Sequence, residues 1–361
     1  MTAFAPIANA ETRNYHDHII DLLRGVAALT VFVSHADQGG LLKFDFISNH
    51  KIFLGRFGVY LFFILSGYLI WRSANRMLPK PRGVAIYVIH RITRIVPLYL
   101  VNIAFVVFLL ELLGSAFHPI VTTESLLRHL TFSQSLLPSV SRDLNPVLWT
   151  ITHEAIYYAI VPLLFLLRAP LWGVTCLAAV FLLLDKFGLR FAVSPFLSLF
   201  YLFVIGILVA EANTAAACLG AVLLLAILRF TDPNQSYDFV PAVSAAAMFL
   251  LIWPAFGLCM RWPRVIPWTR PLCWAGVISY SLYIWHYLLV NILSTPENFG
   301  HMRSIFWILW KSDYTRALVV TGLALSVSYA SYLCIEAPSM NSMRKWLTDR
   351  ISQPTQSNSP A

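Results

Sequence analysis

Ionisable side chains interrupt the long apolar stretches of this 361-residue chain at only a few positions. One stretch carries Arg24 near its start and His35 near its end, with Asp21 three residues before the arginine. Glu154 and His286 stand in two later apolar stretches. Charged groups inside membrane spans are costly and mark functional sites by default. These five residues are therefore the first candidates for chemistry.

Some of these residues also have a purely structural explanation. Asp21 and Arg24 are three positions apart, so on a helix they can simply neutralise one another. His286 can serve as a hydrogen-bonded packing residue. Glu154 has no basic partner within its own stretch, which favours a functional role for it.

The composition indicates an integral membrane protein. Hydrophobic residues make up 58% of the chain and charged residues 12%, about half the charged share of a soluble domain. The formal net charge of +9 then indicates basic cytoplasmic loops rather than a nucleic-acid partner. The five cysteines form no CxxC pair, so we expect no disulfide, zinc centre or iron–sulfur cluster.

We predict an all-α, polytopic fold with about ten transmembrane helices, since a span needs about 20 mostly apolar residues. A shorter segment, 125–138, is expected to be re-entrant or interfacial. Residues 1–338 should form one membrane domain without a removable signal peptide, and residues 339–361 a short cytoplasmic, partly disordered tail. The expected spans are 19–36, 55–73, 92–113, 146–167, 171–189, 191–210, 213–230, 241–259, 272–294 and 317–336.

The distribution of basic residues predicts the orientation. Arginine and lysine gather between the second and third spans, between the eighth and ninth, and after the tenth. With a cytoplasmic N-terminus all three regions lie inside, as the positive-inside rule requires. The residues in question are Arg76, Lys80, Arg82, Arg261, Arg264, Arg270, Arg344, Lys345 and Arg350.

Depth along each span separates two groups of candidates. At 1.5 Å per residue, Arg24 lies about 7 Å and His35 about 24 Å from the inner end of the first span. The same arithmetic puts Glu154 about 12 Å below the outer end of the fourth span and His286 about 21 Å above the inner end of the ninth. We therefore expect the two histidines and Glu154 in the outer half of the membrane.

This polarity suits transfer from a phosphate-bearing donor. Guanidinium groups bind phosphate in a bidentate manner, so Arg24, with Arg91 and Arg94, would hold the donor at the cytoplasmic face. About 16 Å of helix separates Arg24 from His35, comparable to an extended pantetheine arm. A histidine oriented by a carboxylate is a suitable general base for an acceptor hydroxyl. We expect His35 to lie within hydrogen-bonding reach of a carboxylate, Glu154 in the first place, either directly or through a water, with His286 as the competing partner or base.

Six motifs in order along the chain resemble the membrane-bound acyltransferase family 3, the O-acetyltransferase type. The resemblance runs from residue 21 to residue 338, almost the whole chain. The motifs are R-x10-H at Arg24 to His35, GVYLFFILSGYLI at Gly58–Ile70, RxxRIxP at Arg91–Pro97, LWTITHEAIYY at Leu148–Tyr158, ISYSLYIWH at Ile278–His286, and E-x-P at Glu336–Pro338.

The chain departs from the family pattern in several places. Tyr60 stands where the family often has aspartate, so an acid role at that position is absent. Thr150 replaces the commoner serine and keeps a hydroxyl group. Thr152 and His153 precede Glu154 where small apolar residues are more usual.

The resemblance implies an enzyme, an O-acyltransferase in the bacterial inner membrane. Its donor would be acyl-CoA, most often acetyl-CoA, used as a co-substrate with no permanently bound cofactor and no metal. Its acceptor would be a hydroxyl of a cell-surface or exported carbohydrate, such as lipopolysaccharide or exopolysaccharide. The partners would be these two substrates and the lipid bilayer.

The resemblance also assigns roles to individual residues. His35 would be the general base or a transient acyl carrier, with Glu154 and His286 as the other catalytic candidates. The donor-binding candidates are Arg24, Arg91, Arg94, Ser66 and Gly67, and the substrate-binding candidates are Tyr68, Trp149, Tyr157 and Tyr283.

Alternatives remain for several of these roles and for the function. Ser66 and Gly67 can instead allow close helix packing, and Arg91 and Arg94 can be positive-inside anchors. Tyr68, Trp149 and Tyr283 can belong to interfacial aromatic belts. Because intramembrane Asp, Arg, His and Glu also build proton relays, a proton-coupled transporter is the alternative function, although no inverted repeat is visible.

The predicted orientation can be tested by cysteine labelling on a cysteine-free background. We expect the loop from Ser73 to His90 to be cytoplasmic and the loop from Thr295 to Thr315 to be external. An impermeant reagent added to intact cells should then spare a cysteine at position 80. Labelling of that position from outside would overturn the orientation.

Overall fold

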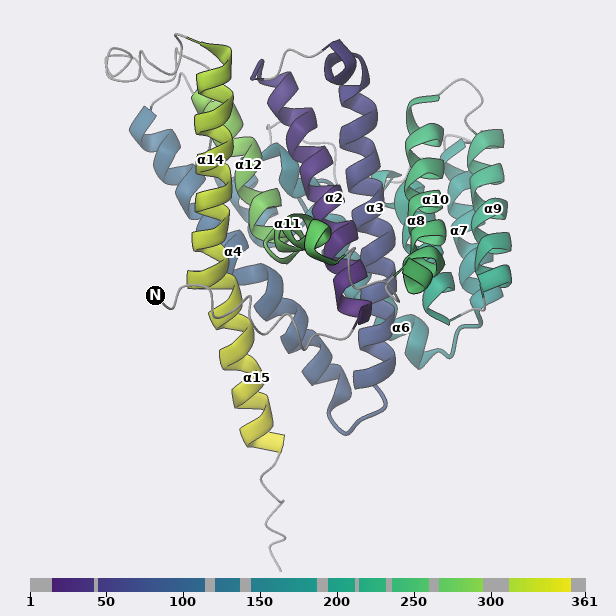
Figure 1. Ribbon diagram of the computed structural model, residues 1–361. Helices are drawn as coiled ribbons and strands as arrows, with labels where there is room; N and C mark the ends of the chain where they lie inside the picture. Colours follow the sequence, from purple (N-terminus) through teal and green to yellow (C-terminus); the bar gives the residue numbers. More distant parts are fainter. Residues whose placement is uncertain are drawn as a thin grey trace, which may run out of the picture.

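The computed structural model describes residues 15–41, 45–113, 121–136, 144–186, 194–211, 214–231, 236–259, 266–294 and 312–351. These residues are helical with short turns and contain no strand, which confirms the all-α prediction (Figure 1). The main helices are α2 (Tyr15–Gln38), α3 (Asp45–Met77), α4 (Gly83–Leu113), α5 (Thr123–Leu130), α6 (Trp149–Leu166), α7 (Leu171–Lys186), α8 (Ser194–Glu211), α9 (Thr214–Thr231), α10 (Ser236–Cys259), α11 (Ile266–Val277), α12 (Ser279–Ser294), α14 (Asp313–Ser331) and α15 (Ala337–Ile351).

Five helices among the described residues are long and apolar enough to cross a membrane, or six if the bent pair α11–α12 counts as one span. They correspond to the first four expected spans and the last one. The other four expected spans coincide with shorter apolar helices, Leu171–Asp185, Ser198–Glu211, Ala215–Thr231 and Asp238–Ile252. The chain is thus a multi-pass membrane protein, while the count of ten and the side of the N-terminus stay predictions.

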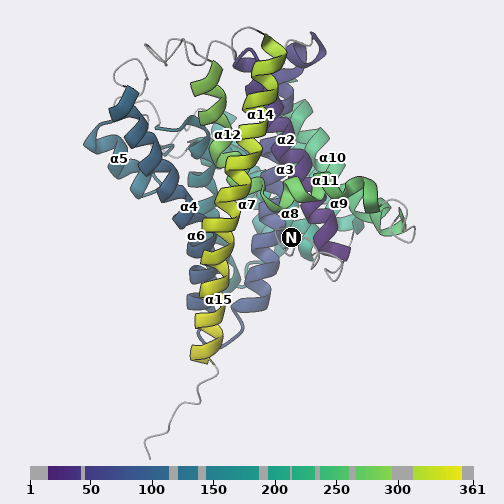
Figure 2. The same ribbon diagram turned by 60° about the vertical axis from the view of Figure 1, so that its left-hand side comes forward.

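The ninth expected span is not one straight helix. α11 and α12 meet at Ile278 with a bend of 70°. α11 runs across the direction of α2, whereas α12 runs alongside it (Figures 1 and 2). The apolar stretch 272–294 predicted a single span because hydropathy does not report a change of axis. As a result, α12 begins inside the protein, where its first residue Ser279 is fully buried.

The last two helices continue one another. α14 passes through a π-helical segment, Tyr332–Glu336, directly into α15, and the buried Glu336 is the last residue of that segment. Pro338, which has no N–H to donate, follows closely after this π-helical irregularity of the helix. Residues 339–351 of the expected tail are therefore helical, and residues 352–361 lie outside the described residues.

Glycines allow two close contacts between helices around the centre of the fold. A Cβ on Gly276 of α11 would collide with the carbonyl oxygen of Asp21 on α2, and one on Gly25 would collide with the carbonyl of Leu272. On the other side of α3, Gly67 faces the backbone of Phe203 on α8 in the same way. Small residues at such crossings let backbones approach, which is how membrane helices pack without a hydrophobic driving force.

Replacing Gly276 by alanine tests the α2–α11 contact. The added methyl group has no space against the backbone of Asp21, so we expect a loss of stability of about 1–3 kcal/mol. Thermal unfolding of the purified protein in detergent measures this loss. Gly322→Ala in α14 is the control, because no atom lies within 4 Å of the added Cβ and stability should not fall. Equal melting temperatures for both variants would contradict the contact.

Candidate active site

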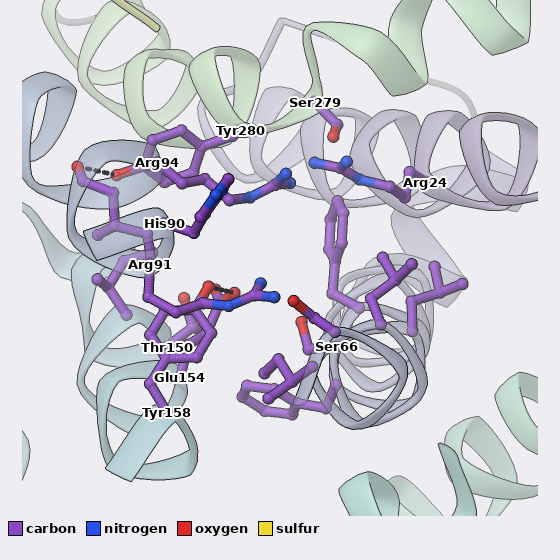
Figure 3. A pocket seen from close by; sticks show the side chains of 18 of the residues that line it. Arg24, Ser66, His90, Arg91, Arg94, Thr150, Glu154, Tyr158, Ser279 and Tyr280 are labelled. Carbon is purple, nitrogen blue, oxygen red and sulfur yellow. Dashed lines mark hydrogen bonds between the residues drawn. The ribbon is translucent and has the colours of Figure 1, made fainter. Parts of the chain in front are cut away.

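A cavity of about 550 Å³ lies between α2, α3, α4, α6 and the start of α12. Polar side chains line it from all of these helices, and Figure 3 shows Arg24, Ser66, Arg91 and Arg94 directed into a shared space. The polar lining consists of Arg24, Ser66, Ser73, Arg76, His90, Arg91, Arg94, Thr150, Glu154, Tyr158, Ser279, Tyr280 and Tyr283.

Three arginines from two helices converge in this cavity. Arg91 and Arg94 lie three residues apart on α4, and Arg24 comes from the opposite wall, so its guanidinium faces that of Arg94 (Figure 3). Arg24 and Arg94 are close enough for their charges to repel. Arg91 lies over the rings of Tyr87 and Tyr158, each at 5.2 Å, and its Nε has no hydrogen-bond partner. The predicted donor-binding arginines therefore share one site.

Carboxylates partly offset this positive charge: Asp21 acts on Arg24, and Glu154 and Glu336 act on Arg24 and Arg94. Glu154 lines the cavity and accepts a hydrogen bond of 2.5 Å from Tyr158, while Glu336 is buried and accepts one of 2.8 Å from Ser281. Both carboxylates attract Arg94. Because Arg76 and His90 add to the basic lining, the cavity keeps a surplus of positive charge and suits an anion.

Hydroxyl groups complete the polar wall. The side chain of Ser279 is fully buried, its Oγ has no hydrogen-bond partner, and Figure 3 shows it beside the Arg24 guanidinium. Ser66 projects into the cavity from α3 opposite Arg91 (Figure 3). A bound oxyanion would provide acceptors for both hydroxyl groups.

The two predicted histidines form a pair outside this cavity. His35 Nδ1 lies 2.9 Å from His286 Nε2, and the side chain of His286 is buried. His286 Nδ1 lies 3.1 Å and 2.8 Å from the carbonyl oxygens of Leu282 and Tyr283, which only accept hydrogen bonds. Nδ1 of a neutral His286 therefore carries the proton and its Nε2 accepts from Nδ1–H of His35. This leaves Nε2 of His35 as the unprotonated, basic nitrogen.

The expected hydrogen bond between His35 and Glu154 is not formed. His35 pairs with His286, the predicted competitor, and Glu154 pairs with Tyr158 in the basic cavity. The depth estimate assumed that residue 146 lies at the outer surface. Instead Asn145, just before it, is buried and donates a hydrogen bond to the carbonyl of Ile284 in α12. α6 thus begins inside the bundle, so the point from which the depth of Glu154 was counted is not a surface of the protein.

The other candidates divide between the cavity and the packed interior. Ser66 and Tyr283 line the cavity. Gly67, next to Ser66, packs against α8, which agrees with the alternative that this glycine allows close helix packing. Tyr68 contacts Phe249 and accepts a hydrogen bond from Arg72. Trp149 packs against Phe63 and His153, and Tyr157 is buried against Phe200 and Phe203. Tyr68, Trp149 and Tyr157 are not part of the cavity wall.

Sequence reasoning missed His90. It lies four residues before Arg94, so both side chains share one face of α4, and this spacing was the available signal. The sequence indicated Arg76 only as a basic residue of a cytoplasmic loop. It indicated no role for Tyr158, Ser279 and Tyr280 beyond their membership in the family motifs. All four line the cavity.

Comparisons with known proteins agree on one family. The family described as "Acyltransferase domain" matches residues 17–334. A protein of Acidianus two-tailed virus named as an acetyltransferase, ORF330, is 28% identical over 302 residues, 78% of this chain and 85% of the relative. The exopolysaccharide production protein ExoZ of Rhizobium meliloti is 26% identical, covering 81% and 91%, and nodulation protein 10 of Rhizobium leguminosarum bv. viciae is 24% identical, covering 93% and 97%. No solved structure matches the chain.

The expectation that Arg24, Arg91 and Arg94 bind CoA can be tested by mutation. Arg94→Ala should weaken CoA binding about tenfold to hundredfold, the value of a charged hydrogen bond. The loss should be larger at low salt, because screening already weakens phosphate contacts at high salt. Calorimetry in detergent measures both. Lys80→Ala removes an exposed charge outside the cavity wall and should leave the affinity unchanged. Unaltered affinity in the Arg24, Arg91 and Arg94 variants would exclude the site.

Proposed function

Because the chain belongs to the acyltransferase family, we propose that it transfers an acyl group, most often acetyl, from cytoplasmic acyl-CoA to a hydroxyl of an exported carbohydrate. A multi-pass protein with this activity would work in the bacterial inner membrane. The relatives named for acetyl transfer and exopolysaccharide production support the reaction and the class of acceptor.

One arrangement carries the proposal. A cavity with a surplus of arginine charge lies next to a pair of hydrogen-bonded histidines, and Tyr283 connects the two. Tyr283 lines the cavity, and the centroid of its ring lies 5.7 Å from that of His286. The backbone carbonyl of Tyr283 also accepts a hydrogen bond from Nδ1–H of His286. A donor whose phosphates bind the arginines would thus direct its thioester toward the imidazoles.

In the proposed reaction, Nε2 of His35 takes the proton of the acceptor hydroxyl. The hydroxyl oxygen attacks the thioester carbonyl carbon, the carbon–sulfur bond breaks, and the CoA thiolate leaves and takes that proton. The products are the carbohydrate ester and CoA thiol. In the alternative order Nε2 first carries the acyl group itself, and the same products result.

His286 would act as a positioning residue for this base. Its Nε2 accepts a hydrogen bond from Nδ1–H of His35, which fixes the tautomer and the orientation of the His35 ring. A carboxylate performs this task in many catalytic sites. Glu154 then belongs to the donor site, where it offsets arginine charge.

The family match favours this function over the transporter alternative, and no feature of the described residues supports transport specifically. A direct comparison uses proteoliposomes with and without acyl-CoA. Incorporation of a labelled acetyl group into a carbohydrate acceptor supports the enzyme, whereas solute uptake independent of acyl-CoA would contradict it.

The two histidines should give different kinetic effects. His35→Ala should lower kcat about 10²- to 10⁴-fold and leave CoA affinity intact, because it removes the base but no cavity residue. His286→Ala should lower kcat less and leave KM for acyl-CoA near that of the wild type. Transfer of labelled acetyl to isolated envelope glycans measures both.

A conservative variant separates positioning from folding. The amide oxygen of His286→Gln can accept the hydrogen bond from His35, so this variant should recover part of the kcat lost in His286→Ala. Near-normal turnover of His35→Ala together with an inactive His286→Gln would assign the chemistry to His286 instead.

A further inference from the structure

The donor cavity has an aromatic end close to the histidines. Phe62 of α3 and Tyr283 of α12 both line it, and their rings meet edge to face with 5.8 Å between centroids. His35 and His286 are not part of the cavity wall. An acyl group that enters with its donor therefore meets the Phe62–Tyr283 contact before it reaches an imidazole.

Tyr283 is held in place by hydrogen bonds. Its hydroxyl donates to the carbonyl of Val147 at 3.1 Å and accepts from the Thr150 hydroxyl at 2.9 Å. Tyr283 is buried, and its ring also contacts the ring of His286. Turning this side chain would break buried hydrogen bonds, so Tyr283 forms a fixed side of the passage.

Phe62 is the side that is held by packing alone. Its side chain has no polar group to satisfy and is only partly buried, at the junction of the core formed by α3 with α8 and the core formed by α2, α12 and α14. Its ring keeps its position through contacts with residues of both cores. Space beside Tyr283 is therefore set mainly by the ring of Phe62.

We propose that Phe62 determines the length of the acyl group that the protein transfers, by closing the end of the donor cavity against Tyr283. This rests on the proposed function. A two-carbon acyl group needs little space beside the ring, whereas a longer chain must occupy volume that Phe62 already fills. Closely packed interiors resist the insertion of even single methylene groups, and one extra methylene in an apolar pocket can change selectivity about tenfold or more.

The experiment compares kcat/KM for acetyl-CoA and hexanoyl-CoA with the full-length protein in proteoliposomes. The wild type should prefer acetyl-CoA at least tenfold. Phe62→Ala should reduce that preference at least tenfold by raising the rate with hexanoyl-CoA. Leu69→Ala is the matched control: Leu69 lines the same cavity seven residues further along α3, two helical turns from Phe62, and its truncation should leave the preference unchanged.

A second variant tests the opposite direction. Phe62→Trp enlarges the side chain and should lower kcat with acetyl-CoA itself, while CoA binding measured by calorimetry stays within twofold and shows that the protein is folded. An unchanged acetyl-to-hexanoyl ratio in a CoA-binding Phe62→Ala, or an equal change in Leu69→Ala, would overturn the role of Phe62.

Failure of the underlying function gives a different result. In that case the wild type would transfer no acyl group from either thioester, whatever residue stands at position 62. A wild type that uses hexanoyl-CoA as well as acetyl-CoA would keep the acyltransferase and overturn the length selection.

Discussion

The main constraint on this structure is the cost of keeping three guanidinium groups within an apolar helix bundle. Each charge must be compensated, because an isolated charge in a low-dielectric interior is far more costly than one in water. The protein meets this requirement by bringing oppositely charged side chains together from different helices. Arg24 arrives from α2, Arg91 and Arg94 from α4, and the carboxylates Glu154 and Glu336 from α6 and from the π-helical segment after α14. The site therefore exists only when four segments distant in sequence are assembled together.

The histidine pair follows a different solution, since the two rings need no carboxylate. Carbonyl oxygens of α12 determine which nitrogen of His286 carries a proton, and His286 in turn determines the tautomer of His35. The backbone of α12 thus determines the direction of the hydrogen bond between the two histidines. A neutral pair of this kind can lie among apolar side chains at a lower desolvation cost than an ion pair.

The sequence alone predicted a large part of this arrangement. Helices were visible as apolar runs, and the common depth of Arg24, Arg91 and Arg94 at the cytoplasmic end, together with the family motifs, indicated a shared basic site. The predicted partner of His35 was wrong because the depths of His35 and Glu154 depend on span ends taken from hydropathy. Hydropathy detects that residues 146–167 and 272–294 are apolar, but it does not show that α6 begins at a buried Asn145 or that α12 begins after a 70° bend. Both facts depend on contacts between helices, which no local pattern contains.

The partial compensation of charge has a functional reason under the proposed donor. If every guanidinium in the cavity were matched by a carboxylate, phosphates would have to displace internal partners before they could bind. If none were matched, the repulsion between Arg24 and Arg94 would oppose folding in the absence of ligand. Glu154 and Glu336, with Asp21 acting on Arg24 from outside the cavity wall, oppose the three arginines, while Arg76 and His90 add positive charge to the same wall. The compensation is therefore partial. Partial compensation thus lowers the repulsion among the arginines and leaves positive charge available to an anion.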